Sequence, residues 1–150
     1  MLLLVSLAAT LAGCASGDAF RAAPPRADAA LIYIYRPKQY NVLAGLVPNA
    51  TPHRISVNGS FLVDLQNGGY TSYFAKPGTN TFGSAMKYSH SGLVALANSR
   101  KELLRTNLDA GQVYYLRFAL GGFGPKLRVV DAATGEREIQ HCKLNVEEER

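Results

Sequence analysis

Two thiols and three imidazoles are the side chains of this sequence best suited to covalent or metal chemistry. The imidazoles belong to His53, His90 and His141, which lie in separate segments. A metal site needs several ligands that converge on one point, and a nucleophile needs a base within hydrogen-bond reach. His141 and Cys142 are adjacent, and neighbours in a strand project to opposite faces. The spacing therefore argues against a metal site and against a Cys/His catalytic pair.

The carboxylates and glycines predict no catalytic site either. Glycines 121, 122 and 124 lack the Lys-Ser/Thr partner of a phosphate loop and indicate a strand connection. Aspartates in turns usually accept hydrogen bonds from backbone amides. Most internal carboxylates stand in or beside predicted turns: Asp64, Asp109, Asp131, Glu136 and Glu138. We expect no catalytic residue, no metal and no cofactor, and we predict that the protein is not an enzyme.

The remaining thiol, Cys14, follows an apolar N-terminal run. Residues 2–9 are apolar but fewer than the roughly 20 residues that cross a bilayer as a helix, which is typical of the central region of a signal peptide. The next residues resemble the lipobox of bacterial lipoproteins, in which a branched aliphatic and two small residues precede the cysteine that is acylated: Leu11, Ala12, Gly13 and Cys14. The sequence therefore predicts a signal peptide over residues 1–13 and a mature chain that begins at Cys14.

Lipidation at Cys14 would decide where the protein works. The thiol would carry a diacylglycerol and the new N-terminus a further acyl chain of the palmitate class, which are the only non-protein groups we expect. Several acyl chains hold a protein on a bilayer permanently, whereas one chain holds it only marginally. Ala15 and Ser16 follow the cysteine, and the resemblance to lipoproteins of two-membraned bacteria then implies the outer membrane, facing the periplasm.

Length and charge bound the rest of the chain. After a spacer over residues 14–29, residues 30–145 suffice for one domain, and a charged tail follows over residues 146–150. The formal charge of +5 suits contact with anionic headgroups or envelope polymers. Nucleic acid is not an expected partner, because it would require a basic stripe with interleaved aromatics.

Cys142 has no thiol partner once Cys14 is lipidated, and we expect it to be buried on a C-terminal strand.

Alternation with a period of two predicts strands through most of the domain. The Asn58-Gly59 pair accepts the positive φ angles of a type I′ turn and predicts a hairpin between Ile55-Val57 and Phe61-Leu65. Turn formers separate the other strands that we expect, which are Leu31-Tyr35 and residues 70–75, 79–84, 101–108, 112–120, 126–130 and 138–144. This pattern predicts an all-β fold, an antiparallel β-sandwich of about seven to nine short strands with a minor helix at most.

Two apolar runs lack alternation, residues 40–47 and 92–97. One interpretation is that they are short elements that cover the core. The other is that they are exposed loops which contact a membrane or a partner, since a sizeable exposed apolar patch usually marks an interaction site.

Several tyrosines fall on the predicted strands, where some must face outward. An exposed tyrosine can stack on sugars or anchor a protein interface, because it combines apolar area with a hydroxyl. The alternative is that these residues lie at the edge of the core with their hydroxyls in water. The candidate binding surface consists of Tyr33, Tyr35, Tyr73 and Tyr115.

The ordered set of short motifs resembles the bacterial lipoprotein family that carries domain of unknown function 2846. The segments that carry the resemblance are Leu31-Pro37, Ile55-Gly59, Asn67-Tyr70, Lys76-Thr79, Gly111-Tyr115 and Glu138-Ile139. The resemblance implies location and fold, and no activity.

These observations predict a membrane-anchored envelope lipoprotein that acts as a non-enzymatic binding or accessory module. We expect it to meet the membrane through its lipid and to contact an envelope protein or polysaccharide. The alternatives are a hydrolase acting on envelope material and a structural assembly factor.

Overall fold

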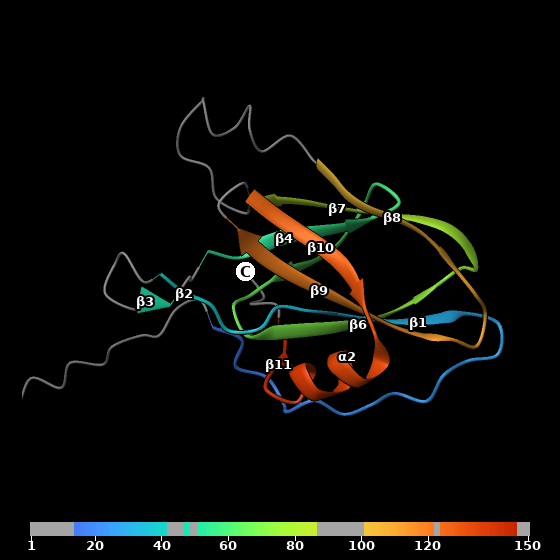
Figure 1. Ribbon diagram of the computed structural model, residues 1–150, viewed down its shortest axis with the longest axis horizontal. Helices are drawn as coiled ribbons and strands as arrows, with labels where there is room; N and C mark the ends of the chain where they lie inside the picture. Colours follow the sequence, from blue (N-terminus) through green and yellow to red (C-terminus); the bar gives the residue numbers. More distant parts are fainter. Residues whose placement is uncertain (1–13, 42–46, 49–50, 87–100, 122–123, 147–150) are drawn as a thin grey trace, which may run out of the picture.

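The computed structural model describes residues 14–41, 47–48, 51–86, 101–121 and 124–146. In these residues two β-sheets pack face to face and one helix covers an outer face (Figure 1). The predicted all-β sandwich with a minor helix is confirmed. No helix in these ranges is long and apolar enough to span a bilayer.

The larger sheet has five strands in the order β10-β9-β1-β6-β11. Its central strand β1 is antiparallel to β6 but parallel to β9, and β11 is parallel to β6, so this sheet is mixed. The strands are β1 (Ala30–Tyr35), β6 (Gly69–Ala75), β9 (Val113–Gly121), β10 (Gly124–Val130) and β11 (Lys143–Leu144).

The smaller sheet has four antiparallel strands in the order β5-β4-β7-β8. A separate two-stranded hairpin, β2–β3, projects beyond one end of the sandwich (Figure 1). The strands are β4 (His53–Val57), β5 (Ser60–Leu65), β7 (Gly78–Met86) and β8 (Lys101–Leu108), with β2 (Tyr40–Asn41) and β3 (Val47–Pro48) in the hairpin.

The Asn58-Gly59 turn joins β4 to β5 as predicted, with φ angles of 49° and 81°. The register then shifts, because Ile55 pairs with Val63 whereas Ser56 pairs with Phe61. Leu62 is therefore the additional residue of a β-bulge. The bulge turns Phe61 to the outer face, although strict alternation predicts that Phe61 shares the inner face of Val63 and Leu65.

Helix α2 (Ala132–Ile139) replaces the beginning of the strand that we expected over residues 138–144. The side chain of Asp131 caps the helix by accepting a hydrogen bond from the Thr134 amide at 2.9 Å. Gly135 lies against the ring of Tyr115, so the helix approaches β9 closely. The cap at Asp131 and the close packing at Gly135 therefore outweigh the alternation that predicted a strand from residue 138 onward.

Two apolar clusters lie on opposite faces of the larger sheet. The inner cluster fills the space between the sheets, and it includes Ile32, Ile34, Leu116 and Phe118. The outer cluster lies between the larger sheet and α2 and consists of Leu31, Tyr33, Tyr35, Tyr70, Tyr115, Ile139 and Cys142. The burial of β1 on both faces agrees with its uninterrupted apolar sequence.

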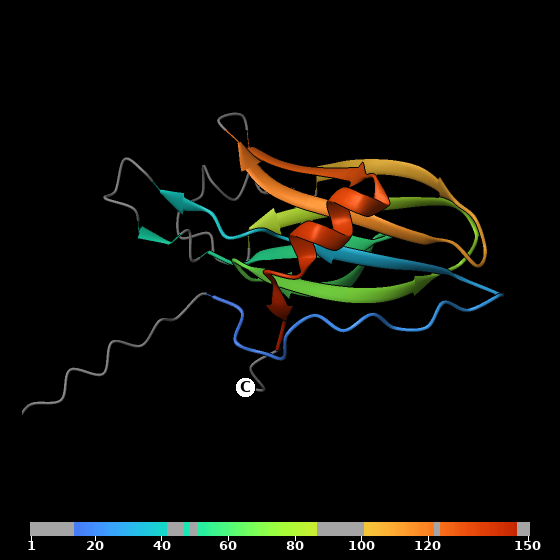
Figure 2. The same ribbon diagram turned by 60° about the horizontal axis from the view of Figure 1, so that its bottom comes forward.

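Residues 14–29 were expected to form a flexible spacer, but they run along the domain beside α2 and β6 (Figure 2). The ring of Phe20 packs edge-on against Tyr33 and Tyr70, with centroids 5.1 and 5.2 Å away. The backbones of Ala15 and Gly17 donate hydrogen bonds to Asn67 and Leu144. One aromatic side chain and these pairings therefore attach the segment to the outer cluster.

Of the two apolar runs without alternation, residues 92–97 lie outside the described part of the chain. The other run is described only at its two ends, where Tyr40 and Val47 belong to the β2–β3 hairpin.

Candidate functional site

The tyrosines predicted to form a binding surface are packed inside the molecule. Tyr33 is 1% exposed, and Tyr35 and Tyr115 are also buried. These three point to the outer face of the larger sheet as alternation predicts, but α2 and residues 14–29 cover that face. Tyr73 faces the other way, half-buried against the inner cluster. The prediction of an exposed binding surface was wrong for Tyr33, Tyr35 and Tyr115, because coverage by the helix and the N-terminal segment cannot be inferred from strand alternation.

Polar contacts of the same tyrosines hold the helix and the N-terminal segment on the sheet. The Tyr35 hydroxyl donates to the Glu138 carboxylate at 2.6 Å, and Arg117 forms an ion pair with the same carboxylate at 2.9 Å. The Tyr33 hydroxyl accepts from the Ala23 amide at 2.6 Å. Burial and the Glu138 charge raise the pKa of Tyr35. These hydroxyls therefore have structural partners.

Ligand-binding chemistry gathers instead on the outer face of the smaller sheet. Phe61 is 52% exposed there, and the Arg54 guanidinium lies over its ring at 4.9 Å. Arg54 also holds Asp64 through two hydrogen bonds of 3.0 and 3.2 Å. An aromatic ring, a cation and a carboxylate thus lie side by side on β4 and β5.

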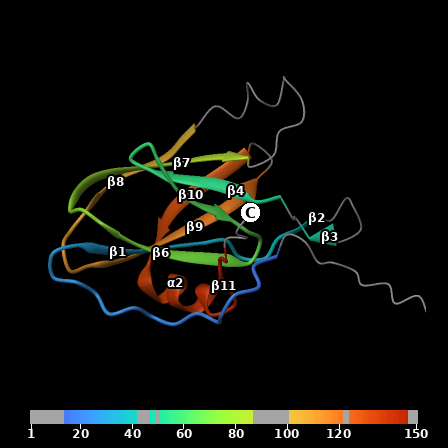
Figure 3. The same ribbon diagram turned by 180° about the vertical axis from the view of Figure 1, so that it is seen from behind.

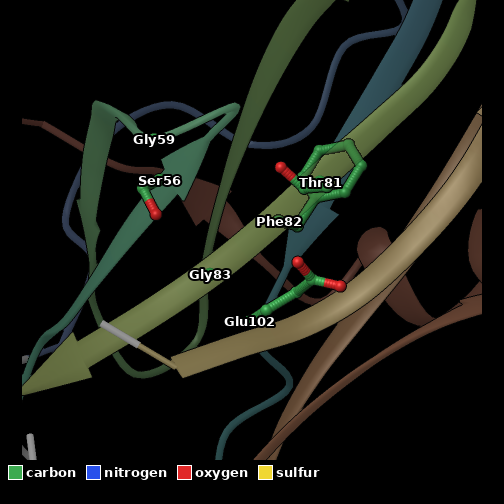
Figure 4. Close-up of a pocket in the computed structure, with 6 residues that line it drawn as sticks. All are labelled: Ser56, Gly59, Thr81, Phe82, Gly83 and Glu102. Atoms are coloured by element: carbon green, nitrogen blue, oxygen red, sulfur yellow. The ribbon is translucent and has the colours of Figure 1, made fainter. Parts of the chain in front are cut away.

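A shallow groove continues this face across β7. The groove has a volume of about 160 Å³ and lies over Gly83, where a side chain would meet the Ser56 hydroxyl and the Lys101 carbonyl. Figure 4 shows the Ser56 hydroxyl and the Glu102 carboxylate on either side of β7, with Thr81 farther along the groove. Ser56 also lines a second, smaller hollow beside Phe61, so the two features form one strip.

The carboxylate of the groove is held as an acceptor. Arg105 contacts both oxygens of Glu102, at 3.1 and 2.9 Å. This hydrogen bonding lowers the pKa of Glu102. A depressed pKa keeps the group ionised and suits hydrogen-bond acceptance, whereas a general acid needs a pKa near the working pH. With the Ser56 and Thr81 hydroxyls, the groove presents acceptors and donors next to an aromatic ring.

We name the strip formed by Arg54, Ser56, Phe61, Thr81, Gly83 and Glu102 the open-face groove. The sequence did not predict it, because strict alternation puts Phe61 on the same face as Val63 and Leu65, and Glu102 belongs to no motif. The Gly83 position carried a weak signal, since glycine inside a strand often marks a bulge or a close approach. The register of β7 and β8 does shift between Phe82 and Gly83.

His53 and Arg36 form a buried polar pair between the sheets. His53 is 3% exposed, and its ring lies 5.0 Å from that of Phe118. Burial, and the nearby charge of Arg36, lower the pKa of His53 to about 4. Burial also lowers the pKa of Arg36 to about 10, and its guanidinium donates to the Thr51 carbonyl at 2.9 Å. Both side chains are enclosed, which favours a structural role.

The thiol and the imidazole near the C-terminus differ in exposure. Cys142 is buried, whereas His141 is exposed. Burial raises the pKa of the Cys142 thiol to about 12, so it is protonated at neutral pH. The prediction that Cys142 is buried is confirmed, but Cys142 lies in the connection between α2 and β11 and not on a strand. In the ranges that the structure describes, no three His, Cys, Asp or Glu side chains are placed to hold a metal ion.

Cys14 lies at one end of the sandwich, directly against the domain. Its backbone forms a bridge with Asn67, which precedes β6, and the side chain is partly exposed. Asn67 is fully buried, and its amide pairs with the backbone of Gln39 through two hydrogen bonds of 2.9 Å. The lipobox residues Leu11, Ala12 and Gly13 precede the described residues.

A sequence model for proteins of unknown function (DUF2846) matches residues 26–124. The match includes β1 to β9, and therefore the whole smaller sheet with the open-face groove. No curated protein matches this chain.

Proposed function

The chain belongs to the family described as proteins of unknown function, DUF2846, and from that premise we propose that it is an envelope lipoprotein, anchored through Cys14, whose open-face groove binds a polysaccharide. It acts by contact, without turnover. We place it on the outer membrane, facing the periplasm.

One observation carries the proposal: the outer faces of the two sheets differ in whether other elements cover them. Helix α2 and residues 14–29 cover the larger sheet, whereas no element that the structure describes covers the smaller sheet. The aromatic ring of Phe61 and the groove lie on that uncovered face. A sandwich with one covered and one open face is suited to binding on the open one.

The chemistry of the open-face groove favours a glycan. Sugar rings present hydroxyls to polar groups and C–H surfaces to aromatic rings, and the groove supplies both kinds of contact. The Arg54–Asp64 and Arg105–Glu102 pairs hold their charges in fixed positions, so less ordering is required on binding.

Binding is tested by co-sedimentation of the chain from residue 14 onward with purified peptidoglycan sacculi. Phe61→Ala and Glu102→Gln are each expected to weaken binding about tenfold, the loss typical of the few residues that contribute most to an interface. Val129→Ala is the matched control, because Val129 is an exposed apolar residue on the other sheet. Equal losses in all three variants, or no retention of the wild-type chain, would contradict the proposal.

Two other outcomes of the same experiment would favour the alternatives. Release of soluble fragments from the sacculi would indicate a hydrolase. Retention of one stoichiometric protein from an extract, with no sacculus binding, would indicate an assembly factor.

Anchoring is tested separately by mass spectrometry of the protein purified from bacterial membranes. We expect an N-terminal peptide that begins at an acylated Cys14, and a Cys14→Ser chain that leaves the membrane or keeps its leader. An unmodified full-length N-terminus in the cytosol would contradict the anchor and leave the groove to its own test.

A further inference from the structure

Several chain segments converge at the end of the sandwich where Cys14 lies, which we call the anchor end. Here β1 and β9 finish and β6 and β10 begin, as their pairing registers require. Cys14 and Ala15 pair with the backbone of Asn67 at this end. A lipid on Cys14 would therefore start at the surface of the domain, with no spacer in between.

Four lysines lie at the anchor end on separate segments. Lys38 follows β1 and packs over Gly68, and the ammonium of Lys126 lies close to Gly121 at the end of β9. Lys143 pairs with Gly69 at the start of β6, and Lys101 begins β8. All four are exposed, and none of the ion pairs formed among the described residues involves them.

The carboxylates are distributed differently. Asp64 and Glu102, which lie toward the anchor end, are each held by an arginine. Asp18 is an exposed carboxylate near this end, while its carbonyl accepts from the Leu144 amide. Asp28 and Asp109 lie at the turns of the opposite end. Among the described residues, positive charge therefore exceeds negative charge at the anchor end.

An exposed aromatic side chain lies beyond the same end. Tyr40 is 52% exposed and belongs to the β2–β3 hairpin. Figure 3 shows this hairpin projecting from the end of the sandwich at which the described chain begins. Tyrosine is enriched at membrane–water interfaces, where its ring meets acyl chains and its hydroxyl meets headgroups.

We propose that the anchor end is a membrane-docking surface, in which Lys38, Lys101, Lys126 and Lys143 contact the phosphates of an anionic phospholipid bilayer while Tyr40 enters its interface. The inference rests on the proposed anchoring and adds the orientation of the domain. Basic side chains near an anionic surface each strengthen binding several-fold. Three observations point to this occupant: the described chain begins here at Cys14, the charge of the described residues is complementary, and the end carries an exposed aromatic side chain.

Docking in this orientation determines where the open-face groove points. Phe61 lies next to the Asn58-Gly59 turn, at the end of the sandwich opposite Cys14. The ring would then stand away from the bilayer, available to a polymer in the periplasm. The lipid and the lysines hold one end of the domain, and the groove is presented at the side and the far end.

The docking surface is tested with the chain from residue 14 onward, which contains every described strand and α2. It carries Cys14→Ser, so that binding cannot depend on acylation, and it is mixed with vesicles of phosphatidylcholine alone or with an equal part of phosphatidylglycerol. We expect binding to the anionic vesicles only, and at least a tenfold loss in Lys126→Glu/Lys143→Glu. Lys76→Glu/Arg128→Glu changes the net charge equally away from the anchor end and is expected to retain more of the binding.

The absence of tryptophan from the chain allows a direct measure of orientation. Tyr40→Trp and Phe61→Trp place one fluorophore at positions of equal exposure, 52% each, at opposite ends. Brominated acyl chains should quench the tryptophan at position 40 and leave that at position 61 unchanged. Both tryptophan variants are made in the chain that ends at Arg150 and again in a chain that ends at Val146. The shorter chain lacks the three glutamates at positions 147–149.

Three results would overturn the docking surface: no binding to anionic vesicles, equal losses in the two charge-reversed chains, or quenching at position 61 without quenching at position 40. None of them bears on acylation, which the mass of the N-terminal peptide decides. If Cys14 is acylated but the tryptophan of Tyr40→Trp is not quenched, the proposed anchor stands and the proposed orientation of the domain is wrong.

Discussion

At the scale of single residues, packing alters the chemistry of His53 in the pH range where stability can be measured on acidification. Its ring is enclosed beside Phe118, with the Arg36 charge nearby. Both effects disfavour the imidazolium form and lower the pKa to about 4, below the ordinary value of 6.5. The folded protein therefore keeps this imidazole neutral at pH values where the unfolded chain protonates it.

The lowered pKa of His53 predicts a stability that falls on acidification. The contribution is fully present above pH 6.5 and is lost as the pH falls toward 4, because only the unfolded chain then gains the proton. The loss is about 3 kcal/mol if the whole difference in pKa is expressed. Urea unfolding at several pH values should show this slope in the wild-type chain. The slope should remain in the control His141→Gln, which removes an exposed imidazole.

His53→Gln removes the titrating group and should flatten the slope between pH 6.5 and 4, whatever its effect at neutral pH. A His53→Gln chain with an unchanged slope would show that other groups cause the acid sensitivity.

At the scale of elements, helix α2 depends on one residue without a side chain. A Cβ atom at Gly135 would overlap the Cβ and ring of Tyr115 on β9. Alanine in place of glycine normally stabilises a helix by about 0.5–1 kcal/mol. Here the packing reverses that sign, because the helix cannot keep its place over the sheet.

Gly135→Ala is therefore expected to destabilise the fold by about 1–3 kcal/mol, the usual cost of overpacking a core. Thermal or urea unfolding measures the change. Ala133→Gly, on the exposed side of the same helix, is the control and should cost only about 1 kcal/mol. A stabilised Gly135→Ala chain would mean that α2 does not pack on Tyr115.

At the scale of the whole molecule, residues 14–29 decide how close the domain lies to the lipid anchor that we propose at Cys14. A spacer would allow the domain to move away from the bilayer. The packed segment, attached by Phe20 and by backbone pairing at Asn67 and Leu144, holds the domain close to Cys14.

Phe20→Ala tests the attachment of this segment. It is expected to lower the free energy of unfolding by about 1–3 kcal/mol, less than for a fully buried phenylalanine because Phe20 is only partly enclosed. Arg21→Ala changes the exposed neighbour and should have little effect on stability. Equal stability of the wild-type and Phe20→Ala chains would restore the spacer interpretation.

The sequence by itself determined most of the strands, the Asn58-Gly59 turn, the all-β class and the family. These features follow from the φ angles that a residue accepts and from side chains alternating along a strand, which neighbouring residues specify. The tertiary structure alone decided which face is open. Phe61 faces outward because of a bulge, and Tyr33, Tyr35 and Tyr115 are buried because α2 and Phe20 cover them. Coverage depends on contacts between residues far apart in the chain, such as Tyr35 and Glu138, and no local pattern contains that information.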